Sequence, residues 1–381
     1  MNGILYSIVV LLIVSCSHSE QQEKPKAPLS AKPASKGIKA KPTGQTSNWH
    51  AFFQKAPSED QITMMKQKLD TWLNSDQIAS LTKAARTQAV LGHYDASIQS
   101  YRAVIRNQPD NTRAIIELSQ VYLRQGRLDR SFASLKEAKQ NIDNNEQPDI
   151  DTITQYEYTL GLAYIKKGNE LKGHSILSKL ISKDPSFSPA YAAMSSSYLK
   201  RNKLELSEFI AKRGLDRGKE DSSLTNLLGV IAYKRGKIVE AKRWLKRSLK
   251  QNPNFVPAII NRANISVYRG EYESAEAGLK RAISLKPDSG TAYTVLGILY
   301  RKQSRFKESE AALLKALDLN PESAHSRYNL AVLKAKSQDD PGQALRLFHE
   351  VLQITSSDKK LTQEARMSIE SLKDTSTLRN L

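Results

Sequence analysis

Cysteine and the familiar catalytic motifs are almost absent from this chain of 381 residues. Cys16 is its only cysteine, so no disulfide can form within the chain. The histidines are scattered, and His349-Glu350 lacks the second histidine that a metalloprotease helix carries four positions after the first. The chain has no Gly-x-Ser-x-Gly elbow and no phosphate-binding Gly-Lys-Ser/Thr loop. These absences predict a protein that is not an enzyme and that needs no metal and no cofactor.

The prolines, by contrast, follow a fixed spacing. Pro253, Pro287 and Pro321 stand 34 residues apart, and Pro185 lies two such intervals before Pro253. Self-similarity at this period is the signature of a solenoid built from helix-turn-helix units. The periodicity therefore predicts the fold class directly, and it favours binding over catalysis.

Each period repeats the residue types that two packed helices need. A small residue in the first helix is followed twelve positions later by another in the second helix, as in Gly229 and Ala241 or Gly297 and Ser309. Small side chains at both places let the two helices approach closely. The turn between the helices usually holds a glycine, where a helix end needs a left-handed residue: Gly92, Gly126, Gly168, Gly236 and Gly270.

This pattern resembles the tetratricopeptide repeat family and covers most of the chain. The resemblance implies an all-α fold, a right-handed superhelical solenoid of about eight repeats within residues 78–352. We place the units at Ile78–Pro109, Thr112–Asn141, Thr154–Pro185, Ser188–Lys219, Ser222–Pro253, Val256–Pro287, Gly290–Pro321 and Ala324 to about Leu352.

Some units depart from the pattern. In the fourth unit Asn202 replaces the turn glycine, and the eighth needs one extra residue around 340–342 before Ala344 and Phe348 come into phase. About eight residues are inserted between units two and three, in the acidic stretch 143–151. This stretch lacks the alternating acidic pattern of a calcium loop. We expect an ordinary polar loop or a loop that contacts a partner.

Both ends of the repeat region carry amphipathic segments that suit capping helices. Apolar residues recur at helical spacing in residues 49–77 and again in residues 353–381, so each segment has one face to bury. The two stripes are Ile62, Met65, Leu69 and Trp72, and Leu361, Ala365, Ile369 and Leu372.

The N-terminus suggests export. Residues 4–15 form an uncharged, largely apolar run of twelve residues, too short to span a bilayer and typical of a signal peptide. The run ends in Ile13-Val14-Ser15-Cys16, which resembles a bacterial lipoprotein signal. That resemblance implies a signal peptide at 1–15 and lipidation, such as palmitate, at Cys16. With Ser17 after the cysteine, it also implies the periplasmic face of the outer membrane.

The segment after Cys16 differs in composition from the repeats. Residues 16–48 are rich in Lys, Pro, Ala and Ser and carry almost no large apolar side chains. Such a segment cannot bury enough surface to fold, so we expect a disordered tether between the lipid and the repeats.

Positive charge exceeds negative charge along the whole chain. Lys and Arg number 58 against 39 Asp and Glu, a formal net charge of +19. The basic motifs flanked by aromatic residues that nucleic-acid modules use are absent. An exported protein with this charge fits anionic envelope polymers or acidic protein surfaces, so nucleic acid is not expected as a partner.

The resemblance also implies a binding site. In tetratricopeptide proteins the first helices of successive units line a concave groove, where ligands commonly lie. Asparagine and tyrosine there suit an extended peptide or a helix, because amides bond a backbone and aromatic faces pack side chains. The candidate groove residues are Tyr158, Asn226, Tyr233, Asn261, Asn264, Arg301, Tyr328 and Asn329.

Taken together, these features predict a protein-binding scaffold anchored to the bacterial envelope. Its plan is similar to that of the pilotin lipoproteins that support assembly of type IV pilus or secretion machines. Two alternatives stay open: a recruiter of peptidoglycan-remodelling enzymes, and a groove that serves as a carbohydrate-binding or catalytic cleft.

Overall fold

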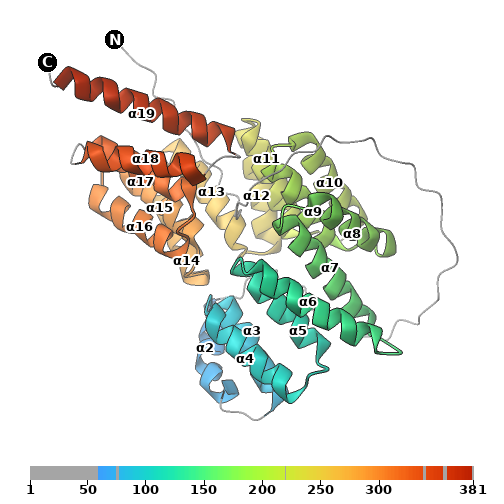
Figure 1. The fold of residues 1–381 in the computed structure, drawn as a ribbon. Coiled ribbons are helices and arrows are strands. Elements are labelled where there is room, and N and C mark those ends of the chain that lie inside the picture. Colours follow the sequence, from blue (N-terminus) through green and yellow to red (C-terminus); the bar gives the residue numbers. More distant parts are fainter. Residues whose placement is uncertain (1–58, 74–76, 219, 338–339, 355–357, 380–381) are drawn as a thin grey trace.

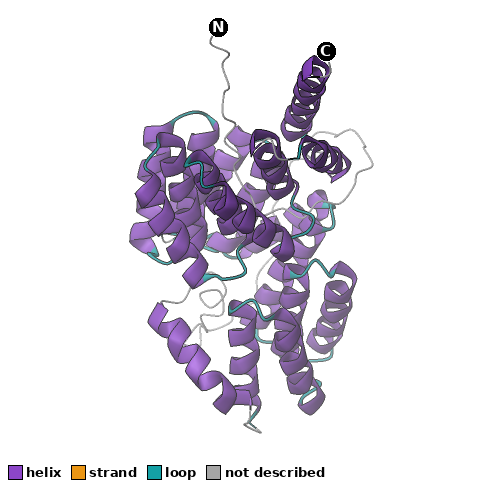
Figure 2. Ribbon diagram, turned by 90° about the vertical axis from the view of Figure 1, so that its left-hand side faces the viewer, coloured by secondary structure: helices purple, strands orange, loops and turns teal. Residues whose placement is uncertain are grey.

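The structure is a computed structural model that describes residues 59–73, 77–218, 220–337, 340–354 and 358–379. These residues form eighteen helices. Figure 2 shows helices and loops, and no strand, among the described residues. The helices pack in consecutive antiparallel pairs (Figure 1). The predicted all-α solenoid is confirmed.

Eight helix pairs lie between two flanking helices, α2 (Glu59–Leu73) and α19 (Lys359–Arg379). Five of the second helices end two residues before a proline, because proline cannot continue a helix; the prolines are Pro109, Pro185, Pro253, Pro287 and Pro321. The pairs are α3 (Ile78–Val90) with α4 (Tyr94–Asn107), α5 (Thr112–Arg124) with α6 (Leu128–Asp143), α7 (Ile150–Lys166) with α8 (Glu170–Lys183), α9 (Ser188–Lys200) with α10 (Leu204–Arg217), α11 (Ser222–Lys234) with α12 (Ile238–Gln251), α13 (Val256–Arg269) with α14 (Tyr272–Leu285), α15 (Gly290–Lys302) with α16 (Phe306–Leu319), and α17 (Ala324–Ser337) with α18 (Pro341–Ile354).

Small buried residues mark the point where the two helices of each pair cross. At Gly297 an added Cβ atom would lie 2.6 Å from the Leu313 side chain, so only glycine fits. Ser309 lies opposite and donates its hydroxyl to the Gly297 carbonyl at 2.7 Å. The same spacing of twelve recurs in the first seven pairs, and the eighth has thirteen, as its extra residue predicts. The crossing residues are Ala85 and Ser97, Ser119 and Ser131, Gly161 and Gly173, Ser195 and Ser207, Gly229 and Ala241, Ala263 and Ala275, Gly297 and Ser309, and Ala331 and Ala344.

The predicted left-handed turns are confirmed. The five glycines have φ values between 76° and 89°: Gly92, Gly126, Gly168, Gly236 and Gly270. Two repeats place another residue there, Asn202 with φ 56° and Ser304 with φ 61°. Asparagine tolerates this region better than most residues, so Asn202 keeps the turn geometry without glycine.

The insertion between the second and third repeats forms a loop over residues 144–149, as predicted, and the two flanking helices extend into the ends of the 143–151 stretch. Helix α7 begins at Ile150, four residues before the predicted start of its unit, and α6 continues to Asp143. Asp149 explains the early start, because its carboxylate accepts hydrogen bonds from the backbone N–H groups of Asp151 and Thr152. These bonds hold the pKa of Asp149 below its usual value despite partial burial.

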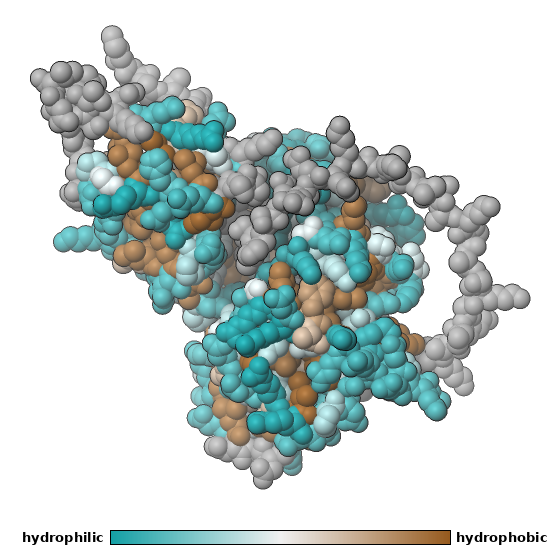
Figure 3. All heavy atoms as spheres, viewed as in Figure 1, coloured by the Kyte–Doolittle hydropathy of each residue, from teal (hydrophilic) through white to brown (hydrophobic). Residues whose placement is uncertain are grey.

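The two flanking helices bury the faces that their sequences predict. In α19, Leu361, Ala365 and Ile369 are buried and contact the last helix pair. In α2, Ile62 is buried, while Leu69 and Trp72 are half-buried. On the face that Figure 3 shows, polar residues cover much of the described surface, with apolar patches between them.

The direction in which the solenoid curves follows from its contacts. Within the described residues, successive first helices touch each other from α5 to α17, whereas successive second helices make no comparable contact. When the first helices of successive repeats lie closer together than the second helices, the solenoid bends so that the first helices are on its concave side. The first helices therefore line the inner face, and the second helices form the outer face.

The curvature brings the first repeat against the sixth and seventh. Helix α2 contacts α14, although more than 190 residues separate them (Figure 1). The Tyr94 hydroxyl donates to Asp288 Oδ2 at 2.9 Å, and Gly92 lies so close to Asp288 that an added Cβ would be 2.6 Å from its Cγ. Ile62 and Leu91 join the apolar cluster of the sixth and seventh repeats. We call this contact the clasp.

Candidate functional site

Three amides lie together on the inner face, on neighbouring first helices α11 and α13. Asn261 donates from Nδ2 to Asn226 Oδ1 at 2.9 Å. No hydrogen bond within the described residues uses the side chain of Asn264. An amide offers two donor hydrogens and two acceptor lone pairs, so all three residues keep bonding capacity for a ligand.

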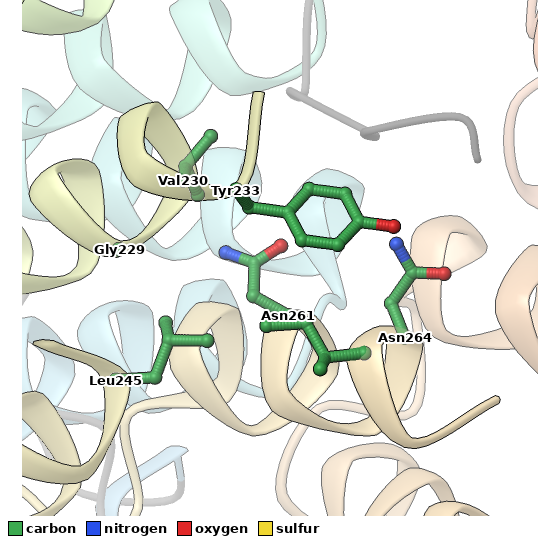
Figure 4. A pocket seen from close by; sticks show the side chains of 7 residues that line it. Gly229, Val230, Tyr233, Leu245, Asn261 and Asn264 are labelled. Carbon is green, nitrogen blue, oxygen red and sulfur yellow. The ribbon is translucent and has the colours of Figure 1, made fainter. Parts of the chain in front are cut away.

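Tyr233 borders the same place. A small cleft between α11 and α13 is lined by Val230, Tyr233, Asn261 and Asn264, with Leu245 beneath (Figure 4). The Tyr233 ring lies across it, and its hydroxyl points toward Asn264. Burial, with Tyr268 nearby, raises the pKa of Tyr233. The phenol therefore stays protonated and can donate a hydrogen bond.

The other aromatic candidates and Asn329 are occupied by packing. Tyr158 meets Phe187 of the next repeat edge-to-face, with ring centroids 5.6 Å apart. Tyr328 is buried and packs against Phe348 of its own repeat at 5.5 Å. The buried Asn329 donates to the His325 carbonyl at 2.8 Å. The structure thus brings Asn226, Tyr233, Asn261 and Asn264 together. Tyr158, Tyr328 and Asn329 instead make contacts within the repeat domain.

Arg301, at the end of α15, differs from comparable arginines. Its side chain is half-buried, its Nε is buried, and it has no hydrogen bond or ion pair with any described residue. Burial lowers its pKa. The next residue, Lys302, is also half-buried, and its pKa is lowered by burial and by Arg301 and Lys336. Arg301 and Lys302 stand at the end of α15, and Lys336 stands near the end of the neighbouring first helix α17, which contacts α15.

A buried network in the first two repeats escaped the sequence analysis. Glu117 in α5 is fully buried and accepts two hydrogen bonds from Arg86 in α3, at 2.6 and 2.8 Å. The Tyr101 hydroxyl donates to the same carboxylate at 3.0 Å. The signal was available, because a glutamate occupies an otherwise apolar face of the Thr112–Arg124 helix. The ion pair of Arg86 with Glu117 joins the first and second repeats, and it neutralises the buried carboxylate of Glu117.

The described residues contain no group of three or more His, Cys, Asp or Glu side chains that could hold a metal ion. Among them no helix is long and apolar enough to cross a membrane. Cys16, the signal peptide and the tether lie outside the described residues, so the lipidation and localisation stay predictions.

Comparisons with known proteins agree with the repeat geometry. The tetratricopeptide repeat family matches residues 82–146, 260–324 and 294–358. This chain therefore contains tetratricopeptide repeats, which are generally non-catalytic scaffolds for protein interaction. A search of curated protein sequences found no match.

Solved structures are similar in fold. One is a chain of the APC/C hetero-tetramer Cut9–Hcn1, with 16% identity, a TM-score of 0.58 and coverage of 86% of this chain. This chain spans 63% of that one. A second is the human IFIT1 dimer with PPP-AAAA, with 14% identity, a TM-score of 0.50, and coverage of 80% of this chain and 74% of the other. At such low identity these likenesses establish the fold alone.

Proposed function

We propose that this protein is a non-enzymatic scaffold that holds a segment of another protein against its inner face. The observation that carries the proposal is a cluster of three side-chain amides, those of Asn226, Asn261 and Asn264, on the adjoining first helices α11 and α13. Each amide keeps donors or acceptors that a ligand can use. Amides at this spacing can exchange hydrogen bonds with an extended backbone, and Tyr233 adds an aromatic face beside them.

The proposal extends to an envelope role. The lipoprotein-like N-terminus and the lysine-rich tether support a scaffold held by lipid on the periplasmic face of a bacterial outer membrane. From there it would support assembly of an outer-membrane machine, in the manner of pilotins. Recruitment of peptidoglycan-remodelling enzymes uses the same anchor and groove, so the identity of the captured protein separates the two roles.

The groove is tested by replacing Asn261 and Asn264. We expect Asn261→Ala with Asn264→Ala to weaken capture of the partner while changing the melting temperature only slightly, since within the described residues the two side chains make a single hydrogen bond, from Asn261 to Asn226. A photo-reactive residue at Tyr233 should cross-link the partner in the wild-type background, with the cross-linked peptide mapped by mass spectrometry. Arg243→Gln, on the exposed face of α12, is the control. Equal cross-linking by wild type and double variant would place the binding site elsewhere.

The anchor is tested separately. We expect Cys16→Ala to prevent acylation and release the protein from the outer-membrane fraction, because stable attachment needs more than one acyl chain. Fractionation with mass spectrometry of the mature N-terminus measures both effects. An unmodified Cys16 in the wild-type protein, or a mature N-terminus elsewhere, would disprove the anchor without affecting the groove.

A further inference from the structure

The half-buried arginines provide an internal comparison. Six described arginines have intermediate exposure, and five of them form ion pairs: Arg86, Arg113, Arg235, Arg305 and Arg327. Arg301 is the sixth and has no carboxylate partner within the described residues. A guanidinium that loses water without gaining a partner lowers the stability of the fold. Arg301 is therefore ready for a partner that the described residues do not supply.

The surroundings of Arg301 concentrate positive charge. Lys302 follows it on α15, and Lys336 occupies the equivalent position of the next first helix, 34 residues later. Neither lysine forms an ion pair with a described residue. The adjoining C-terminal region contributes two carboxylates: Asp358 lies 3.7 Å from His325, and Glu364 lies 4.0 Å from Lys360 with its Oε1 buried and without a hydrogen bond to a described residue. Neither forms an ion pair with Arg301, Lys302 or Lys336 within the described residues.

The geometry of these groups indicates an anion. A guanidinium forms two parallel hydrogen bonds with a carboxylate or a phosphate, and the lysines add charge without fixed geometry. The neighbouring first helix α13 carries Asn261, which donates one hydrogen bond to Asn226, and Asn264, whose side chain bonds no described residue. Their remaining donors and acceptors suit a polypeptide backbone. A ligand that runs from these amides to Arg301 would therefore present its backbone first and a carboxylate next. This order favours a peptide over a phosphate polymer.

We propose that Arg301, Lys302 and Lys336 form a subsite for an acidic side chain of the bound segment, so that the partner is an extended acidic peptide. This inference rests on the proposed function and deepens it. It names the chemical class of the partner and the place on the inner face where its charge is recognised.

The test uses the full chain and a fluorescent twelve-residue peptide of alternating Glu and Ala, with the Gln-Ala peptide as the neutral probe. Anisotropy should show binding of the acidic peptide alone. Arg301→Gln should weaken it by about tenfold, the loss of a charge-assisted hydrogen-bonded pair. Lys302→Gln should weaken it less. The matched control, Arg243→Gln, removes the same charge from an exposed outer position and should leave affinity within about twofold.

A second measurement separates recognition from structure. Because Arg301 is unpaired, Arg301→Gln should leave the melting temperature unchanged or raise it, whereas Arg86→Gln should lower it by stranding the buried Glu117. Equal weakening by Arg301→Gln and Arg243→Gln would overturn the subsite. Binding of polyphosphate or RNA without binding of the acidic peptide would overturn the peptide class. If the acidic peptide fails while Tyr233 still cross-links a partner, the acidic class alone is wrong and the scaffold function stands.

Discussion

Single glycines on the helices have opposite roles that depend on the atoms around them. At Gly229 in α11, an added Cβ would lie 2.9 Å from Cγ and Cδ2 of Leu245, in the crossing of the fifth pair. At Gly278 in α14, the nearest atom would be the Ala263 Cβ at 3.6 Å, an ordinary contact. Gly229 is thus required by packing, while Gly278 gives the helix only backbone freedom.

Alanine at these two glycines should change stability in opposite directions. Gly278→Ala should stabilise the protein by about 0.5–1 kcal/mol, because alanine loses less entropy in a helix and its methyl group makes only ordinary contacts with Ala263 and Ile259. Gly229→Ala should destabilise it by about 1–3 kcal/mol, since Leu245 must leave its packed position. Urea unfolding with a linear extrapolation measures both. Stabilisation by Gly229→Ala would mean that the crossing is looser than the structure indicates.

At the scale of helices, each pair depends on two small residues that face each other. In the sixth pair these are Ala263 and Ala275, and Ala275 is fully buried. Helix α14 also borders the seventh repeat through the apolar cluster that contains Leu279 and Leu296. A change in the spacing of α13 and α14 must therefore reach the next repeat.

Ala275→Leu tests this coupling. The larger side chain should push α13 and α14 apart and cost about 1–3 kcal/mol, with faster hydrogen exchange in both neighbouring repeats. Ala277→Leu, two residues away on the exposed side of α14, adds the same atoms to the solvent face and should have little effect. Faster exchange confined to α14 in the Ala275 variant would contradict the proposed coupling.

At the scale of the whole molecule, the clasp adds a contact between the first repeat and the sixth and seventh repeats, which are not neighbours in sequence. Stability in an open repeat array is carried between neighbours. Here the Tyr94–Asp288 hydrogen bond and the burial of Ile62 join segments that are far apart in sequence. Burial and Asp288 raise the pKa of Tyr94 to about 12, so this hydroxyl remains a donor at neutral pH.

Opening the clasp should expand the molecule. Ile62→Asp places a charge in the shared apolar cluster, and with Tyr94→Phe it removes both parts of the contact. X-ray scattering should then show a larger radius of gyration, and hydrogen exchange should rise around Asp288. Met64→Asp, at an exposed position on α2, is the control. An unchanged radius with unchanged exchange would show that the rest of the solenoid keeps its curvature without the clasp.

The candidate site shows which of its features the repeat pattern of the sequence predicts and which it does not. The sequence places Asn226, Asn261 and Arg301 on the inner sides of first helices, because the repeat period assigns every residue to a face. It does not separate them from Tyr328, which occupies a similar helix face but packs against Phe348. That difference depends on which side chains the adjoining helix presents, and a single helix pattern does not contain this information.

The sequence by itself determined the helix pairs, the crossing residues, the left-handed turns and the apolar faces of the two flanking helices. All of these depend on contacts within one repeat or between neighbours, which a period of 34 residues encodes. Only the tertiary structure decided that Arg301 has no ion-pair partner among the described residues and that Tyr94 meets Asp288. Both depend on small rotations between repeats that add up along the solenoid, and no local residue pattern specifies their sum.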